Sequence, residues 1–296
     1  MNFLIDCDAV TSIVGFGAQW KQLGLKLPTG VEWFPEEKCT SKSELSNQTI
    51  GYFADELSFT DKDIISKNVS LPKGVIKRIL YQYMGSIHDK LETLFPEEFK
   101  EENIHYFFTG KDSQTHNFRF KLAPQGFPYK NTRGVKPESV KLAYDIGIEI
   151  FNTNQHIITG AEADDGIARY KRKYPDSVIV ANDKDYTQLV GKYFDLHKSR
   201  FCLREFNELE AERNLWELVL KGDAADTTPG LRDWVRVFNP GAEHELQYSS
   251  KYSKKWSTGA WEKELGLGPE GVVKHLYAKF GVPIEAMYAS YVMVKL

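Results

Sequence analysis

Cysteine is scarce in this chain of 296 residues, and its three copies, Cys7, Cys39 and Cys202, follow no zinc-binding spacing. Three distant thiols do not make a disulfide scaffold and fit a reducing cytoplasm. Long apolar runs are also lacking, and none approaches the roughly 18 residues that a membrane span requires. The N-terminus has no basic region followed by an apolar run, so we expect neither a membrane protein nor a secretory signal.

An excess of positive charge is the third absence. The chain has 38 basic and 41 acidic residues, a net charge of −3, which is unusual for a protein that binds nucleic acid. Nine of the acidic residues are clustered, however. If metal ions neutralise those nine, the other 32 face 38 basic residues, a balance of +6 that favours a phosphate-binding surface.

The nine carboxylates fall in five short clusters along the chain. The clusters are Asp6; Asp112; Glu162, Asp164 and Asp165; Asp183 and Asp185; Asp223 and Asp226. So many ionised carboxylates cannot share a site without cations, and their hard oxygen atoms suit Mg²⁺ or Mn²⁺. Two such ions about 3.5–4 Å apart are the usual means of cutting a phosphodiester. The pattern therefore predicts a metal-dependent nuclease.

Short apolar runs alternate with helical patterns. Strands are expected at 3–5, 104–108, 157–158, 178–180 and 193–196, and helices at 74–95, 140–150, 164–174 and 205–220. This alternation predicts an α/β fold with a central, mainly parallel sheet flanked by helices. Several carboxylates directly follow a predicted strand, and ligands of such sheets gather beyond the carboxyl ends of the strands.

The order of the motifs resembles the 5′-nuclease family, which has a PIN-like fold. The motifs are FLID, GKD with a following FR, YKNTR, GAEADD, NDKDYTQL and GDAADTTPG, from Asp6 to about Gly230. The family comprises bacterial and phage 5′→3′ exonucleases and flap endonucleases. The resemblance implies two Mg²⁺ or Mn²⁺ ions and a cytoplasmic protein, in a bacterium or in the host of a phage. It assigns Asp6, Asp112, Glu162 and Asp164 to one ion, Asp183, Asp185, Asp223 and Asp226 to the other, and Asp165 to either.

Basic and aromatic residues in YKNTR complete the expected site. Lys130 would neutralise charge that develops on the phosphate. Arg133 would bind the phosphate through two of its guanidinium nitrogens, and the Tyr129 ring would stack on a terminal base. Lys121, Lys136 and Lys141 would extend this basic track, although each could also be an ordinary surface lysine. Lys130, Arg133 and Asp185 are the residues on which we expect cleavage to depend.

The resemblance also predicts two regions. Residues 1–226 would form the catalytic domain, with part of 20–100 as an insertion, and 227–296 a smaller, mostly helical DNA-binding region. The latter would carry a helix-hairpin-helix-like element split by residues 232–265, with Gly268, Gly271 and Lys274 on the DNA backbone and K⁺ as a candidate ion. The intervening residues Lys251, Lys254, Lys255, Trp256 and Trp261 fit either nucleic-acid binding or a loop with two packed tryptophan rings. Only 31 residues separate Lys130 from Glu162, so any arch for a 5′ end is short.

Three other functions compete with the nuclease. A haloacid-dehalogenase-like phosphatase would use Asp6 as nucleophile and Asp8 as acid and base; a PIN-type ribonuclease would share the fold and several acids. A DNA-binding protein with a decayed site would lack a ligand, and none is missing. The expected partners are DNA with 5′ ends or flaps, RNA–DNA hybrids and replication proteins, with a monomeric chain and no membrane.

Overall fold

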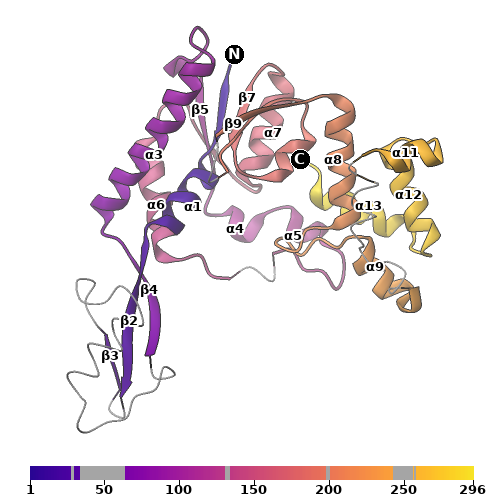
Figure 1. Cartoon of the computed structure of the whole chain (residues 1–296), viewed down its shortest axis with the longest axis horizontal. Coiled ribbons are helices and arrows are strands. Elements are labelled where there is room, and N and C mark those ends of the chain that lie inside the picture. The colour runs from indigo at the N-terminus through magenta and orange to yellow at the C-terminus, as the bar shows by residue number, and fades with distance from the viewer. Residues whose placement is uncertain (28–29, 34–63, 131–133, 198–200, 243–255, 257) are drawn as a thin grey trace. The chain divides into compact units, whose positions relative to one another are not determined.

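The computed structural model describes residues 1–27, 30–33, 64–130, 134–197, 201–242, 256 and 258–296. The chain forms two compact units (Figure 1). The first unit comprises Met1–Val10, Ser86–Val135 and Ile150–Leu296, and the second comprises Thr11–Gly85 and Lys136–Glu149. Helices α1 (Cys7–Gly17) and α3 (Lys73–Leu94) pass from one unit to the other.

A six-stranded sheet in the order β6-β5-β1-β7-β8-β9 forms the centre of the first unit. Its strands are β1 (Phe3–Asp6), β5 (Ile104–Thr109), β6 (Gln155–Ile158), β7 (Val178–Ala181), β8 (Gly191–Asp195) and β9 (Cys202–Phe206). Four of the five pairings are parallel, and only β9 runs antiparallel, against β8. The predicted α/β fold with a mainly parallel sheet is therefore confirmed.

Apolar side chains cover both faces of the central strand β1, whose four residues are all buried. Successive strand residues point to opposite faces. Leu4 packs in a core cluster with Ile167 of α7 (Ala163–Lys173), whereas the Phe3 ring lies 5.5 Å from the ring of Phe95, which follows α3. Helical segments on both faces explain the continuous apolar run, because a parallel sheet is normally buried on both sides.

Helix α8 (Glu208–Lys221) begins three residues later than predicted. Glu205 instead pairs with Lys192 in the ladder between β9 and β8. Asn207 caps the helix: its side chain accepts from Glu210 N, and the Glu210 carboxylate accepts from Asn207 N. This reciprocal capping box therefore predicts the first residue of the helix more accurately than the apolar periodicity does.

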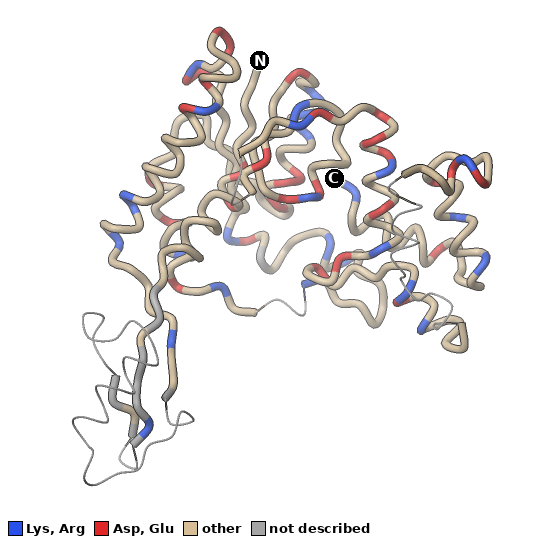
Figure 2. Tube along the Cα trace, viewed as in Figure 1, with Lys and Arg blue, Asp and Glu red and all other residues tan. Residues whose placement is uncertain are grey.

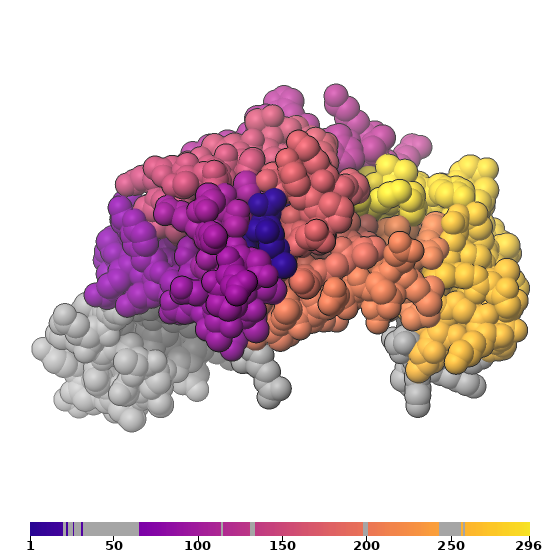
Figure 3. Space-filling model, turned by 90° about the horizontal axis from the view of Figure 1, so that it is seen from above, coloured from indigo at the N-terminus to yellow at the C-terminus, as the bar shows by residue number. Residues whose placement is uncertain are grey.

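The rest of the first unit is mostly helical. Its other helices are η2 (Glu101–Asn103), α4 (Ser113–His116), α5 (Arg119–Leu122), η3 (Lys184–Gln188), α9 (Leu231–Phe238), α11 (Ala260–Leu265), α12 (Pro269–Lys279) and α13 (Ile284–Val294). The C-terminal helices share an apolar cluster with α8. Helices α12 and α13 contact α8, and Figure 3 shows the yellow C-terminal part of the chain beside the orange part that contains α8. The helical character expected for 227–296 is confirmed for the residues of this range that the structure describes, and the split hairpin element stays a prediction.

Trp256 and Trp261, the two tryptophans named above in the 232–265 segment, contribute to this core. Trp256 is buried in the apolar cluster, and Trp261 packs against it. Trp256 is therefore packed in this conformation and offers no face to a base, whereas a nucleic-acid role for the partly buried Trp261 stays a prediction. Lys251, Lys254 and Lys255 lie outside the described residues.

The second unit contains a three-stranded antiparallel sheet in the order β3-β2-β4 and helix α6 (Glu138–Ile150). The strands are β2 (Gln19–Leu27), β3 (Gly30–Trp33) and β4 (Ile64–Ser70). Gly15 of α1 allows close packing on α6, since a Cβ there would lie 2.5 Å from Val140 Cα. The polar stretch 38–49, which we expected to be a loop, lies outside the described residues.

Basic and acidic residues are interspersed along the helices of the described chain (Figure 2). Over those same residues, no helix combines the length and apolar character needed to cross a membrane.

Candidate metal centre

Two of the acidic clusters meet because their strands are parallel neighbours. Asp6 is the last residue of β1, and Asp183 lies two residues after β7 ends at Ala181. Residues 3–5 of β1 pair in register with 178–180 of β7, so the carboxyl ends of the two strands lie at the same edge of the sheet. This is the edge at which ligands of α/β sheets normally bind.

Asp6 is buried and held at both carboxylate oxygens. Its Oδ1 accepts from the main-chain N of Ala9 at 3.0 Å, and its Oδ2 accepts from the Tyr186 hydroxyl at 2.8 Å. Burial, followed by the charge of Asp8, raises the pKa of Asp6 to about 7, although both hydrogen bonds oppose this shift. A carboxylate so reluctant to ionise gains from a nearby cation.

Asp183 and Asp185 flank the start of η3. Asp183 caps this short helix by accepting from Asp185 N at 3.0 Å. Burial, and then the charges of Asp183 and Asp223, raise the pKa of Asp185 to about 7. Its Oδ1 atom is buried, and no donor among the described residues reaches it. Lys184 forms an ion pair with Asp223 at 3.0 Å and offsets part of this negative charge.

Gln188, at the end of η3, connects this helix to the C-terminal segment of the chain. Its Nε2 donates to Val294 O at 2.9 Å, and its Oε1 accepts from Leu296 N at 3.0 Å. All three residues are buried. The pair of hydrogen bonds fixes η3, and hence Asp185, against the segment that follows α13.

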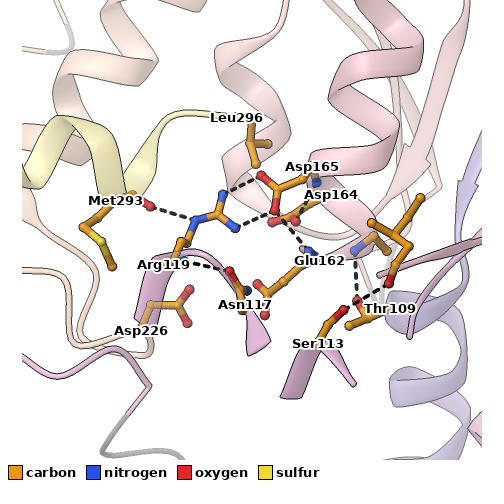
Figure 4. A network of polar contacts seen from close by, with 12 residues as sticks. Thr109, Ser113, Asn117, Arg119, Glu162, Asp164, Asp165, Asp226, Met293 and Leu296 are labelled. Carbon is orange, nitrogen blue, oxygen red and sulfur yellow. Dashed lines mark hydrogen bonds and ion pairs between the residues drawn. The ribbon is translucent and has the colours of Figure 1, made fainter. Parts of the chain in front are cut away.

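The third cluster lies at the start of α7 (Figure 4). Arg119 of α5 donates to Asp165 through both terminal nitrogens, at 2.7 and 2.8 Å, and through Nε to Met293 O at 3.2 Å. The two side chains are only 3% and 7% exposed. Asp165 also accepts from Glu162 N at 3.1 Å. Asp165 is thus fully engaged by the protein, and its role as a direct ligand stays a prediction.

The other two acids of this cluster have opposite electrostatic surroundings. Burial and the charges of Asp165 and Glu162 raise the pKa of Asp164 well above its usual range. Burial, the largest single effect on Glu162, acts in the same direction, but Lys130, Arg119 and the Tyr129 hydrogen bond together outweigh it and lower that pKa. Of these two acids, Glu162 is therefore the one that already has a cation paired with it, as Asp165 has in Arg119.

Lys130 and Tyr129 connect Glu162 to the loop that carries Asp226. Lys130 pairs with Glu162, and its main-chain N donates to Asp226 O at 2.9 Å. Lys130 has a φ of 56°, a left-handed conformation that costs energy for a non-glycine residue. The Tyr129 hydroxyl lies 3.0 Å from Glu162 Oε2 and 3.1 Å from Asp226 Oδ2. One phenol proton thus faces two carboxylates and can satisfy only one of them.

The loop that carries Asp223 and Asp226 is tightly built. Asp223 and Thr228 exchange two main-chain hydrogen bonds of 2.8 and 2.9 Å. Gly222 has a φ of 72°, and a Cβ on it would come within 2.4 Å of Gly230 N. The glycines of GDAADTTPG therefore permit a backbone approach that other residues would block, and the loop presents its two acids rigidly.

Eight acidic residues and two others form a closed circuit of electrostatic neighbours. In order, the circuit runs through Glu162, Asp164, Asp6, Asp183, Asp185, Asp223, Asp226 and Tyr129 back to Glu162, with Asp165 beside Asp164 and Lys130 beside Glu162. Four separate segments of sequence supply the acids, and a fifth supplies Tyr129 and Lys130. The structure thus gathers eight of the nine predicted metal-site acids.

The donor chemistry of this circuit fits a divalent cation. As the side chains lie, no three Asp, Glu, His or Cys residues in the described part of the chain are grouped to hold one ion. However, Asp185 Oδ1 is buried without a donor, and the single Tyr129 proton faces two acceptors. Both features leave oxygen lone pairs that a cation would satisfy. Binding would require Lys130 to leave Glu162.

The remaining predicted residues are not part of this circuit. Asp112 follows β5 with its carboxylate beside Gly110 and joins none of the ion pairs above. Arg133 lies outside the described residues, and Lys136 and Lys141 belong to the second unit. Gly268 precedes α12, whereas Gly271 and Lys274 lie on it, and Lys274 pairs with Glu270 at 2.6 Å. Their roles stay predictions.

Two residues of the site were given no role in the sequence analysis. Arg119 is the arginine of the FR motif, and Tyr186 is the tyrosine of NDKDYTQL. Their motifs marked them, but their function depends on contacts across 46 and 180 residues of sequence. Tyr129 was predicted to stack on a base. Its ring is 3% exposed and offers no face in this conformation, so that role also stays a prediction.

No protein-family model matches the sequence, and no curated protein matches it. Two crystal structures of a bacteriophage T5 flap endonuclease are similar to the chain. A variant in a pseudo-enzyme–product complex with DNA and metal ions is 14% identical, with 72% of this chain and 80% of that chain covered and a TM-score of 0.42. The T5 protein co-crystallised with metal ions is 15% identical over 72% and 82%, with a TM-score of 0.44. At this identity the likeness concerns the fold alone, and an activity must be inferred from the site residues.

Proposed function

We propose that this protein is a metal-dependent nuclease that hydrolyses phosphodiester bonds at or near the 5′ ends or flaps of DNA. The observation that carries the proposal is the closed circuit of carboxylates, with Lys130 and the Tyr129 hydroxyl set into it. Opposing pKa shifts within one cluster of titratable groups are typical of a functional site. An ordinary helix cap or turn would not bring acids from four segments together.

Two divalent ions held among these acids would supply an activated water and stabilise the leaving oxygen. The proposed holders of one ion are Glu162, Asp164 and Asp6, with Asp112 added by the family resemblance. The proposed holders of the other are Asp183, Asp185, Asp223 and Asp226. Asp165 is proposed to keep its pairing with Arg119 and to orient the start of α7.

Lys130 would then contact the substrate, and Tyr129 would contact the acids that hold the ions. Lys130, released from Glu162, would place its ammonium on a phosphate oxygen, where its charge matters most as negative charge develops. Tyr129 would keep its proton, because burial and the charges of Glu162 and Asp226 raise its pKa. Its hydroxyl would therefore donate to one of the two carboxylates and orient it.

The neighbours of Asp6 argue against the phosphatase alternative. A phosphatase that used Asp6 and Asp8 would give no role to Asp164 beside Asp6 or to Lys130 beside Glu162. The phosphatase would form a phospho-aspartate at Asp6, which trapping with a labelled phosphate ester would detect. Preference for a 5′ end, action on RNA–DNA hybrids and a place in replication or repair follow from the motif resemblance and are part of the proposal.

The test uses a 5′-flap duplex, a blunt duplex, an RNA–DNA hybrid and a single-stranded RNA, each labelled at the 5′ end. Incubation in Mg²⁺ should release short 5′ products from the flap or the duplex ends, and EDTA should stop the reaction. Product length separates flap cleavage from exonucleolytic digestion. Cleavage of the single-stranded RNA alone would replace the proposal with the PIN-type ribonuclease, and preferential digestion from 3′ ends would overturn it.

A further inference from the structure

An exposed aromatic ring lies beside the buried Tyr129. The Phe120 ring is 41% exposed and meets the Tyr129 ring edge to face, with 5.5 Å between centroids. The Tyr129 hydroxyl contacts Glu162 and Asp226 at the other end of the same side chain. Phe120 is therefore separated from the carboxylate circuit by the length of one tyrosine side chain.

The backbone of Phe120 is fixed relative to the acids. The preceding residue, Arg119, is tied to Asp165 by two short hydrogen bonds and to Met293 O by a third (Figure 4). The Arg119 main-chain N also donates to the Asn117 side chain at 2.9 Å. A rigid backbone lowers the entropic cost of binding, so a ring carried on it is well suited to receive a planar ligand.

An exposed lysine is the next residue in the sequence after Phe120. Lys121 follows Phe120 directly and is exposed, as is the next residue, Leu122. Basic residues beside an exposed aromatic ring are typical of surfaces that bind single-stranded nucleic acid, where the cation meets a phosphate and the ring stacks on a base. Tyr129 cannot offer its ring for this purpose while it remains buried.

We propose that Phe120 is the platform on which an unpaired nucleobase of the substrate stacks, next to the bond that is cut. The proposal rests on the nuclease function, because it needs a nucleic acid at the carboxylate circuit. The occupant is a single unpaired base, since Phe120 presents one exposed ring next to one lysine. The ring would fix which phosphate enters the site by holding the base attached to it.

The simpler interpretation is that Phe120 is one of many surface apolar residues, which are common in soluble proteins. Tyr174 provides a matched control for this. Its ring is 39% exposed, lies 4.6 Å from the Tyr170 ring and has the Lys173 ammonium 5.1 Å from its centroid. It follows the C-terminal end of α7, whereas the acids lie at the N-terminal end of that helix. If Phe120 stacks on a base, its replacement should weaken DNA binding, whereas replacement of Tyr174 should leave binding unchanged.

The experiment compares Phe120→Leu, Phe120→Trp and Tyr174→Leu in the full chain. Leucine preserves apolar packing on Tyr129 but has no ring face, and thermal melting checks that each variant is folded. The probe is a fluorescent DNA hairpin with a 5′ single-stranded extension, bound in Ca²⁺ so that affinity is measured without relying on cleavage. A series of probes places an abasic site at each unpaired position in turn.

Phe120→Leu should weaken binding about 5- to 100-fold, the range of single base–aromatic contacts. Phe120→Trp should bind at least as tightly as the wild type, and Tyr174→Leu should be unchanged. One abasic position should remove the difference between Phe120→Leu and the wild type, which identifies the stacked base. Equal weakening by Tyr174→Leu, or a Phe120→Leu loss that no abasic position removes, would overturn the stacking role. If the variants and probes give the binding results expected here but the wild-type protein cuts no substrate in Mg²⁺, base stacking on Phe120 would be supported and the proposed nuclease function refuted.

Discussion

Replacing Arg119 with methionine tests whether the buried pair with Asp165 organises the site. Methionine keeps most of the apolar length of arginine but leaves the Asp165 carboxylate, 7% exposed, without either of its short hydrogen bonds of 2.7 and 2.8 Å. Breaking a buried pair from one side is expensive because the remaining charge stays buried without a partner. The hydrogen bond from Arg119 Nε to Met293 O is lost as well.

The expected cost is about 3–5 kcal/mol, the usual range for removing one partner of a buried ion pair. At about 2–4 °C per kcal/mol for a chain of this class, the melting temperature should fall by roughly 6–20 °C. Asp165→Asn in the Arg119→Met background removes the unpaired charge. The double variant should therefore recover part of the loss, which gives a measurable coupling energy.

The assay is chemical and thermal unfolding followed by circular dichroism, with Arg236→Met as the matched control. Arg236 pairs with Asp233 at 3.6 Å on the surface of α9, with both side chains more than a third exposed. Such a pair contributes about 0–1 kcal/mol. If Arg119→Met costs no more than Arg236→Met, or if the double variant is additive, the buried pair does not organise this region as we describe.

Three further predictions concern the circuit itself. Asp185→Asn should abolish cleavage but leave DNA binding measurable, since it alters a proposed metal holder and leaves the basic residues intact; cleavage at the wild-type rate would remove Asp185 from the site. Lys130→Ala should slow single-turnover cleavage about 10²–10³-fold, the usual loss for one group that stabilises developing charge, with little change in affinity; a loss confined to affinity would make Lys130 a docking residue. Tyr129→Phe keeps the ring and removes the hydroxyl shared by Glu162 and Asp226. It should weaken Mn²⁺ binding, measured by calorimetry, about 10-fold, whereas unchanged binding would leave the hydroxyl without a role in holding the acids.

Local sequence patterns predict most of the fold because its strands are short, continuous apolar runs. β1, β5 and β7 are buried on both faces, and their sequences therefore differ sharply from the polar loops around them. Strand β9 could not be predicted in this way. It lies at the edge of the sheet with four of its five residues exposed, so its sequence CLREF carries little apolar signal. The sequence feature that does mark the boundary between β9 and α8 is the Asn207–Glu210 cap of α8.

The acids of the site could be predicted because carboxylates are distinctive and their strands are adjacent. Their partners could not, since each depends on a contact between distant segments. Arg119 meets Asp165, and Tyr186 meets Asp6, only after the sheet and α7 have formed. The direction of a side chain is equally hard to read from the sequence. Tyr129 and Phe120 are both aromatic and close in sequence, yet the structure buries the first and exposes the second.

The most direct test of the central claim is a crystal of the protein soaked in Mn²⁺ and measured at a wavelength where manganese scatters anomalously. Our account predicts two peaks inside the carboxylate circuit, one beside Glu162 and Asp164 and the other beside Asp183 and Asp185, with Lys130 displaced from Glu162. The Asp185→Asn variant should lose or weaken the second peak. A wild-type crystal that shows no anomalous peak among these acids, with Lys130 still paired to Glu162, would contradict the assignment of this circuit as a metal centre.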